Sequence, residues 1–273
     1  MGSEIVRYAS ADFRTRGRRQ RVSVEVGSDP GRTVVQGPGA QASLALTRRH
    51  GDRSGLWAGT DLRRYAEAVG SDGRVVGVDI DETALMHARE RTADLPQVQV
   101  WSADIRALDL ASGSVDAVHT DRVLQHVPDP STALAEAARI LKPGGRAVFA
   151  EPDWRTLVID HAESRLAEAF TRYVVEHQVR NSRIGVALPH LCRDAGLSVA
   201  AAIPVTTVFD SLSAADRVLG FERVTRRAVE HGFLTDSEGR RWLDGLAADW
   251  TCGATTLFVV AASKGSESES HRL

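Results

Sequence analysis

Two hydrophobic patterns alternate along much of the chain. In one, apolar residues recur about every 3.6 positions, and in the other they form short continuous runs. Over residues 61–69, apolar side chains recur at helical spacing. Residues 74–80 (RVVGVDI) then form a short β-branched run, which is typical of a strand buried inside a parallel sheet. A helical pattern follows over 82–92. This alternation predicts βαβ units and an α/β fold.

The same patterns predict the elements farther along the chain. Asp129 supplies an N-cap acid and Pro130 a proline at the first helical position, so we expect a helix there that ends before Lys142. We expect further strands at 98–101, 115–120, 146–150, 198–209 and 255–262, and further helices at 162–180, 185–196, 213–231 and 236–248.

The two ends of the chain carry weaker patterns. Residues 1–26 are expected to form a short helical or extended arm, and 27–41 a Gly- and Pro-rich loop around a β-prone stretch at 33–35. We therefore expect an N-terminal arm and loop over 1–41, one domain over 42–264, and a disordered tail over 265–273.

Composition and charge narrow the function classes. The net charge of -2 gives no general attraction to nucleic acid or to anionic membranes. The arginine cluster over 14–21 has no aromatic platform apart from Phe13, so a solvated surface explains it better than nucleic-acid binding. Cys192 and Cys252 lack metal-ligand spacing, and we expect no metal and no disulfide. Without an apolar stretch of about 20 residues, a soluble, cytoplasmic protein is expected, with no membrane partner.

Acids follow two of the predicted strands. In an open parallel sheet, ligands bind at the carboxyl ends of the strands. Asp79 ends its strand there, where a carboxylate can accept the hydroxyls of a ribose, and Ile80 can pack on an adenine face. The alternative is that Asp79 only caps the next helix. Asp104, between Ala103 and Ile105, follows the next strand and offers a carboxylate to an adenine amino group.

Four stretches occur together, in order and at characteristic spacing: RVVGVDIDETAL (74–85), WSADIRAL (101–108), GSVDAVHTDRVLQHVPDPSTALAEAARILKPGG (113–145) and RAVFAEPDW (146–154). With them, residues 61–152 closely resemble the class I S-adenosylmethionine-dependent methyltransferases. The resemblance is strongest to the branch that methylates small molecules of the ubiquinone and menaquinone type.

The resemblance implies a doubly wound, mostly parallel, seven-stranded sheet of Rossmann-like methyltransferase type, whose last strand, 255–262, is antiparallel. It also implies helical insertions at 162–197 and 213–248 that cover the acceptor site. The implied cofactor is S-adenosylmethionine. Its ribose is held by Asp79, its adenine lies beside Ile80, Ala103, Asp104 and Ile105, and its methionine part lies beside Thr120 and Asp121.

The loop that should cradle this cofactor departs from the family pattern. Gly55 and Gly59 fit the expected glycines, but Trp57 stands where a glycine should let the backbone approach the cofactor. Three explanations are open. The loop is remodelled and still binds, the protein has lost the cofactor, or the reading frame of the gene is disturbed across 27–58. A GxGxxA pattern at 37–42 is a weak dinucleotide fingerprint, which makes a nicotinamide oxidoreductase a distant rival.

Residues near the ends of two later strands are candidates for catalysis. His126 is the first candidate for a general base toward a hydroxyl acceptor, although it also has a structural explanation as part of the approach to the next helix. Glu151 is the second candidate base. Asp153 and Trp154 are expected to face the acceptor, with Trp154 as a wall for an aromatic or prenyl-like molecule.

We therefore expect a methyltransferase that acts on a small organic acceptor, such as a secondary metabolite or a quinone- or isoprenoid-like molecule. The alternative is a relative with the same fold that no longer transfers methyl groups and serves as a binding module or a cyclisation catalyst. A homodimer is compatible with the sequence but not indicated by it.

Overall fold

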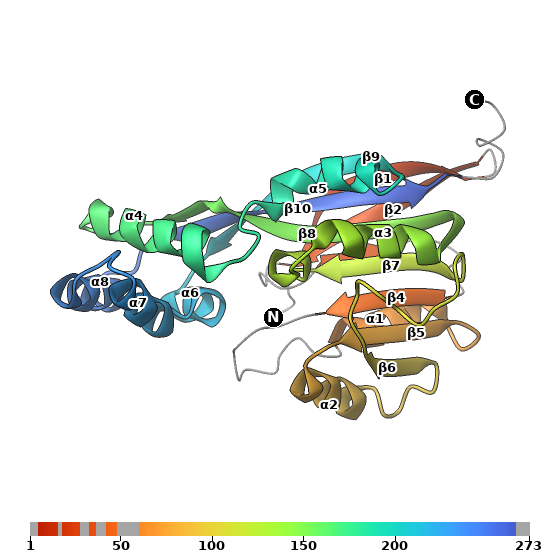
Figure 1. The fold of residues 1–273 in the computed structure, drawn as a ribbon, viewed down its shortest axis with the longest axis horizontal. Coiled ribbons are helices and arrows are strands. Elements are labelled where there is room, and N and C mark those ends of the chain that lie inside the picture. Colours follow the sequence, from red (N-terminus) through yellow and green to blue (C-terminus); the bar gives the residue numbers. More distant parts are fainter. Residues whose placement is uncertain (1–4, 16–17, 28–32, 37–41, 48–59, 266–273) are drawn as a thin grey trace.

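The computed structural model describes residues 5–15, 18–27, 33–36, 42–47 and 60–265. Its main feature is a seven-stranded sheet with helices on both faces (Figure 1). Helices α1 (Thr60–Val69) and α2 (Glu82–Arg91) pack on one face, and α3 (Pro130–Ile140) and α5 (Ile184–Asp194) pack on the other. The strands are β4 (Ala42–Thr47), β5 (Arg74–Asp79), β6 (Val98–Ser102), β7 (Val115–Asp121), β8 (Leu141–Ile159), β9 (Leu197–Phe209) and β10 (Gly253–Lys264).

The sheet has the strand order β6-β5-β4-β7-β8-β10-β9. Strands β6, β5, β4, β7 and β8 pair in parallel, whereas β10 runs antiparallel to both β8 and β9. The chain order reverses beside β4, where Leu46 pairs with Val78 of β5 and with Thr120 of β7. The prediction of an α/β, Rossmann-like fold is confirmed. The reversal brings the ends of β5 and β7 to either side of β4, where open α/β sheets bind their ligands.

Local sequence signals explain where two of the helices begin. Asp81 caps α2, because its side chain accepts hydrogen bonds from the backbone N–H groups of Thr83 and Ala84. Asp129 caps α3 by accepting from Thr132, with Pro130 at the first helical position as predicted. Both caps satisfy N–H groups that a helix leaves without intrahelical partners.

A second lobe, which we call the cap, is built on the far ends of β8, β9 and β10 (Figure 1, left). Its helical parts are α4 (Ser164–Tyr173), a π-helical turn (Val174–Gln178), α6 (Leu212–Leu219), α7 (Phe221–Glu230) and α8 (Asp236–Ala248). The cap has its own apolar core, in which Leu166, Phe170 and Trp242 are completely buried.

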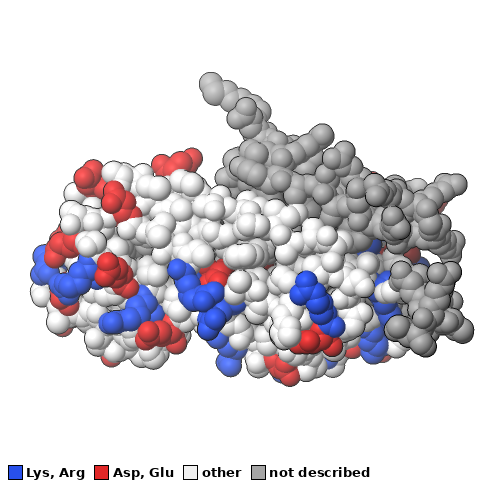
Figure 2. All heavy atoms as spheres, turned by 90° about the horizontal axis from the view of Figure 1, so that it is seen from above, with Lys and Arg blue, Asp and Glu red and all other residues white. Residues whose placement is uncertain are grey.

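Charges of both signs intermix on the outer surface of the cap (Figure 2). Ion pairs Arg165–Glu238 (2.6 Å) and Arg241–Glu163 (3.0 Å) join α8 to α4 and its N-cap. Solvent screens such exposed pairs and they contribute little, so the apolar core carries most of the stability of the cap. None of the helices in the described part of the chain is long and apolar enough to cross a membrane.

Of the helical and the extended arm that the sequence allows at the N-terminus, the structure has the extended form. Residues 5–15 and 18–27 form an antiparallel pair of strands, β1 (Ile5–Thr15) and β2 (Arg18–Gly27). Strand β3 (Thr33–Gln36) pairs with β2, so a separate three-stranded sheet precedes the domain.

Three bounds on the C-terminal side differ from the predicted ones. The strand expected at 146–150 runs on to Ile159, because its far half pairs with β10. The helix expected over 213–231 divides at Gly220, whose φ of 61° lies in the left-handed region that glycine tolerates. Helix α5 packs on the main sheet, so the cap insertion expected over 162–197 ends before this helix begins.

Candidate functional site

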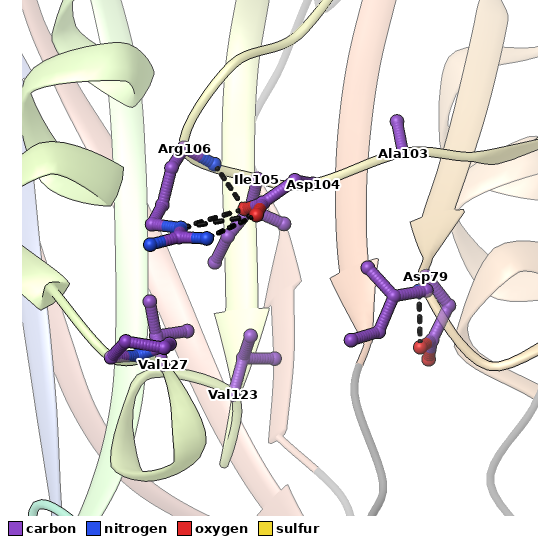
Figure 3. A pocket seen from close by; sticks show the side chains of 9 residues that line it. Asp79, Ala103, Asp104, Ile105, Arg106, Val123 and Val127 are labelled. Atoms are coloured by element: carbon purple, nitrogen blue, oxygen red, sulfur yellow. Dashed lines mark hydrogen bonds and ion pairs between the residues drawn. The ribbon is translucent and has the colours of Figure 1, made fainter.

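A cavity of about 90 Å³ lies at the carboxyl ends of the parallel strands (Figure 3). The ends of β5 and β6 lie side by side there, since Ala103 N donates a hydrogen bond to Asp79 O at 3.1 Å. The segment that follows β7 closes the other side. The lining residues are Asp79, Ile80, Ala103, Asp104, Ile105, Arg106, Val123, Val127 and Pro128. All five residues that the sequence places at the ends of β5 and β6 therefore meet in one cavity.

Asp79 and Ile80 offer a carboxylate beside an apolar surface. Asp79 is buried, and its Oδ1 accepts hydrogen bonds from Ile80 N at 2.7 Å and Asp81 N at 3.0 Å. These two bonds fix the orientation of the carboxylate at the strand end. Ile80 is 49% exposed, which is unusual for a large apolar side chain that lines a cavity. The pair has the chemistry that a sugar edge and a flat aromatic base require.

Asp104 is engaged by a residue that the sequence analysis missed. Its Oδ1 accepts from Arg106 N at 2.9 Å, and its Oδ2 accepts from Arg106 Nη2 at 2.6 Å. The hydrogen bonds that Arg106 donates to the Asp104 carboxylate raise the pKa of Arg106. The expected contact of Asp104 with an adenine amino group must therefore be shared with this guanidinium.

Glu151 holds a single 3-10 turn, η1 (Leu124–His126), that follows β7. Its Oε1 accepts from Val123 N at 2.8 Å and Leu124 N at 2.7 Å, and its Oε2 accepts from Gln125 N at 3.2 Å. The residue is completely buried. Burial raises the pKa of Glu151 to about 8, against the opposite influence of the three N–H donors. These contacts give Glu151 a positioning role under η1, and its role as a base stays a prediction.

His126, the other candidate base, ends η1 and is half-buried. Its backbone N–H donates to Val123 O at 3.0 Å. The histidine lies on the same turn that carries Val123 and Val127 into the cavity wall, but does not itself line the cavity. Its catalytic role stays a prediction.

The structure places Trp154 inside the core of the cap and Asp153 in an ion pair. Trp154 is 7% exposed, and its Nε1 donates to Gln125 Oε1 at 2.7 Å. Asp153 accepts from Arg155 Nε at 2.9 Å. Burial works to raise the pKa of Asp153, but the hydrogen bonds from Arg155 outweigh it and lower the pKa. The expected contacts of both residues with an acceptor stay predictions.

The end of β7 carries a strained backbone. Arg122 has a φ of 54°, and it is the only non-glycine residue with positive φ in the described part of the chain. Its guanidinium binds the Asp121 carboxylate through Nε (2.8 Å) and Nη2 (2.9 Å). Beside it, Thr120 is buried and its hydroxyl has no hydrogen-bond partner among the described residues. Backbone strain of this kind persists where the surroundings hold it, and it clusters at functional sites.

A buried histidine within β7, His119, also escaped the sequence analysis. His119 Nδ1 is 2.8 Å from the Tyr65 hydroxyl, and burial lowers the pKa of His119 to about 4. No motif marks either residue, whereas Arg106 could have been found from its position two residues after Asp104. The predicted loop glycines, Gly55 and Gly59, lie outside the described residues.

Comparison with protein families identifies this part of the chain. Residues 55–149 match the methyltransferase domain family. All nine residues that line the cavity fall within the segment that matches this family. The candidate site and the matched family segment are thus the same part of the molecule.

Two relatives show how far the sequence similarity extends. An uncharacterized 37.1 kDa protein in transposon TN4556 of Streptomyces fradiae is 48% identical over 221 residues, which are 80% of this chain and 64% of that protein. A demethylmenaquinone methyltransferase of Staphylococcus epidermidis is 40% identical over 92 residues, which are 34% of this chain and 38% of that enzyme. The chain thus spans less than two thirds of the length of either relative.

A solved structure shares the fold of this chain. A Bacillus halodurans protein, provisionally assigned as a methyltransferase, superposes with a TM-score of 0.56 at 17% identity. The superposition covers 82% of this chain and 93% of that one. The domain therefore has the Rossmann-like α/β fold of methyltransferases.

Proposed function

We propose that this protein transfers a methyl group from S-adenosylmethionine to a small organic acceptor. The observation that carries the proposal is the cavity at the carboxyl ends of the adjacent strands β5 and β6, where Asp79 ends β5 and Asp104 follows β6, inside the stretch that matches the methyltransferase domain family. The match favours methyl transfer over the alternative of a relative that has lost this activity.

The cavity residues fit an adenosyl group. Asp79 is held by two backbone N–H groups, so its carboxylate is oriented to accept ribose hydroxyls. Ile80 and Ile105 provide apolar surface for the two faces of an adenine. Asp104, together with Arg106, provides a polar edge for the adenine amino group. The remaining wall, Val127, is apolar, as ligand pockets generally are.

S-adenosylmethionine supplies an electrophilic methyl group on a sulfonium. The protein's own work in such a displacement is to align the acceptor with that methyl group and to exclude water. Thr120 and Asp121, at the end of β7, are assigned to the methionine part. The rigid turn that Glu151 holds fixes one wall of the cavity, so that the adenosyl group enters a preformed site.

The acceptor is proposed to bind between this edge of the sheet and the cap. The Staphylococcus epidermidis relative carries the name demethylmenaquinone methyltransferase, which supports an apolar, quinone-like or secondary-metabolite acceptor. His126 is proposed to take the proton of a hydroxyl acceptor, because a histidine can accept a proton near neutral pH.

Calorimetric titration with S-adenosylhomocysteine and S-adenosylmethionine tests the cofactor. We expect micromolar binding to the wild-type protein and a loss of tenfold or more, on the order expected for a charge-assisted hydrogen bond, in Asp79→Asn. The amide oxygen of asparagine can still accept from the two backbone N–H groups, so the variant removes charge while keeping the turn. Asp109→Asn, at an exposed acid away from the cavity, is the matched control. No binding by folded wild-type protein would overturn the proposal.

A further inference from the structure

The cap and the cavity wall meet at one glutamine. Gln125 is buried, at 4% exposure, and both ends of its side-chain amide are used. Its Oε1 accepts from Trp154 Nε1 at 2.7 Å, and its Nε2 donates to the carbonyl oxygen of Arg122 at 3.1 Å. One end of the amide therefore reaches the core of the cap, and the other reaches the strained backbone at the end of β7.

An asparagine makes a second connection at the other end of the same turn. Asn181 Nδ2 donates to the carbonyl oxygens of Leu124 and Val127, both at 2.7 Å. Its backbone N–H donates to Gln125 O at 3.0 Å. Asn181 lies three residues beyond the π-helical turn of the cap. Glu151 accepts from backbone N–H groups of η1 and its N-cap, and Asn181 donates to carbonyl oxygens of η1 and its C-cap. The two residues thus hold the turn from both ends.

Strand β8 delivers Trp154 to this junction through a bulge. Asp153 pairs with Thr256 and Val158 pairs with Ala254, so five steps along β8 match two steps along β10. The Thr156 hydroxyl donates to Asp153 O at 2.7 Å and accepts from Thr256 N at 2.8 Å, which fixes the extra residues. Bulges bend a strand and re-aim side chains near functional sites. Here the bulge sets the indole in the cap core with its N–H on Gln125.

We propose that Gln125 is a positioning residue that couples the order of the cap to occupancy of the cofactor cavity. The inference rests on the proposed function, because the cavity wall that η1 carries, Val123 and Val127, belongs to the cofactor site. A ligand that packs on this wall restrains η1, and η1 restrains the cap through Gln125 and Trp154. Such coupling is reciprocal, so loss of the connection weakens ligand binding as well.

The sharpest variant is Trp154→Phe, which keeps an aromatic ring in the cap core and removes the N–H that Gln125 accepts. Trp250→Phe is the matched control, because the Nε1 of Trp250 has no hydrogen-bond partner within the described ranges of the chain, although the residue packs against the same core. The same atom is therefore deleted at both sites, but a hydrogen bond is lost at only one. Thermal unfolding and circular dichroism establish that both variants fold.

The experiment measures S-adenosylhomocysteine affinity and its effect on amide hydrogen exchange. We expect wild-type protein to bind, with slower exchange at 123–127 and also in the cap at 154–160 and 174–182. In Trp154→Phe the affinity falls roughly three- to tenfold, the range that one buried hydrogen bond supports, and the protection at 154–160 is lost. Protection around Asp79 and Asp104 remains, and Trp250→Phe behaves as wild type.

A double-mutant cycle with Gln125→Leu tests whether the two side chains act through one bond. If they do, the double variant loses no more affinity than the more affected single variant. Additive losses, or a Trp154→Phe protein that matches Trp250→Phe in affinity and exchange, overturn the inference while leaving the proposed function intact. Failure of the wild-type protein to bind S-adenosylhomocysteine overturns the proposed function itself, and this inference with it.

Discussion

Two opposing effects act on Glu151, and the pH dependence of stability separates them. Complete burial disfavours the charged carboxylate, whereas three backbone N–H donors favour it. Burial prevails and raises the pKa of Glu151 from its ordinary value of 4.5 to about 8. Between pH 4.5 and about 8, the native protein therefore retains a proton that the unfolded chain has already released. Replacement by glutamine removes the titration and keeps the shape of the side chain.

The size of the effect follows from the two pKa values. Where the native state binds one proton more than the unfolded state, stability falls by about 1.4 kcal/mol for each rise of one pH unit. Between the ordinary pKa of 4.5 and the native pKa of about 8, wild-type protein should lose up to about 5 kcal/mol relative to Glu151→Gln. Above the native pKa the two stability curves should run parallel.

His119 changes stability in the opposite direction in part of the same window. Burial lowers the pKa of His119 from 6.5 to about 4, so the unfolded chain takes up a proton first as the pH falls. As the pH falls from 6.5 to about 4, protonation of His119 in the unfolded chain lowers the free energy of unfolding by about 3 kcal/mol. The stability curve of wild-type protein alone is therefore uninformative. Only the difference between wild type and Glu151→Gln isolates the carboxyl group.

The assay is urea unfolding of both proteins at several pH values between about 4.5 and 9. Glu136→Gln is the control, because hydrogen bonds from Arg139 lower the pKa of Glu136. Above about pH 5.5, Glu136 is ionised in both the native and the unfolded protein, so the difference in stability between wild type and that variant should stay constant up to about pH 9. A wild-type minus Glu151→Gln difference that stays constant from pH 5 to 8 refutes the reasoning. It would mean that the three N–H donors keep Glu151 ionised.

Three further outcomes follow from single contacts. Gly185→Ala should destabilise the protein by about 2 kcal/mol or more in urea unfolding, because a Cβ there would lie 2.5 Å from the backbone oxygen of Glu151; a stability within 0.5 kcal/mol of wild type would contradict this close approach. Tyr65→Phe should cost about 1–3 kcal/mol by leaving His119 Nδ1 unpaired, and adding His119→Leu should recover most of that loss. Ile80→Ser should weaken S-adenosylhomocysteine binding about tenfold in calorimetry while leaving the free energy of unfolding nearly unchanged, because Ile80 is 49% exposed.

Sequence motifs predict those parts of the fold that depend on contacts between near neighbours in the chain. The start of α3 follows from an acid and a proline in adjacent positions, and the structure shows both acting as expected. Asp79, Ile80 and Asp104 line the cavity because a strand end places the next residues at the edge of a parallel sheet. In each case the deciding contact lies within a few residues of the signal.

Hydrogen-bond partners that lie far apart in the chain cannot be predicted from such motifs. Glu151 bonds to N–H groups 26 to 28 residues before it, and Asn181 bonds to carbonyl oxygens 54 and 57 residues away. The sequence predicts a strand that ends at Ala150, so the acids that follow it are expected to face the acceptor. Glu151 and Asp153 are instead buried and hydrogen-bonded, which lets β8 continue into the cap. The sequence shows that acids follow Ala150, but it does not show which donors hydrogen-bond to their buried carboxylates.

The two candidate bases, Glu151 and His126, are linked through the turn η1. Glu151 binds the N–H groups at the start of η1, and His126 is the last residue of that turn. A base acts only within hydrogen-bond reach of the proton it abstracts, so the position of His126 depends on the contacts of Glu151. Glu151→Gln should then lower the rate of methyl transfer without abolishing it, whereas His126→Gln removes the proposed base. If Glu151 were the base, the ranking of the two variants would be reversed.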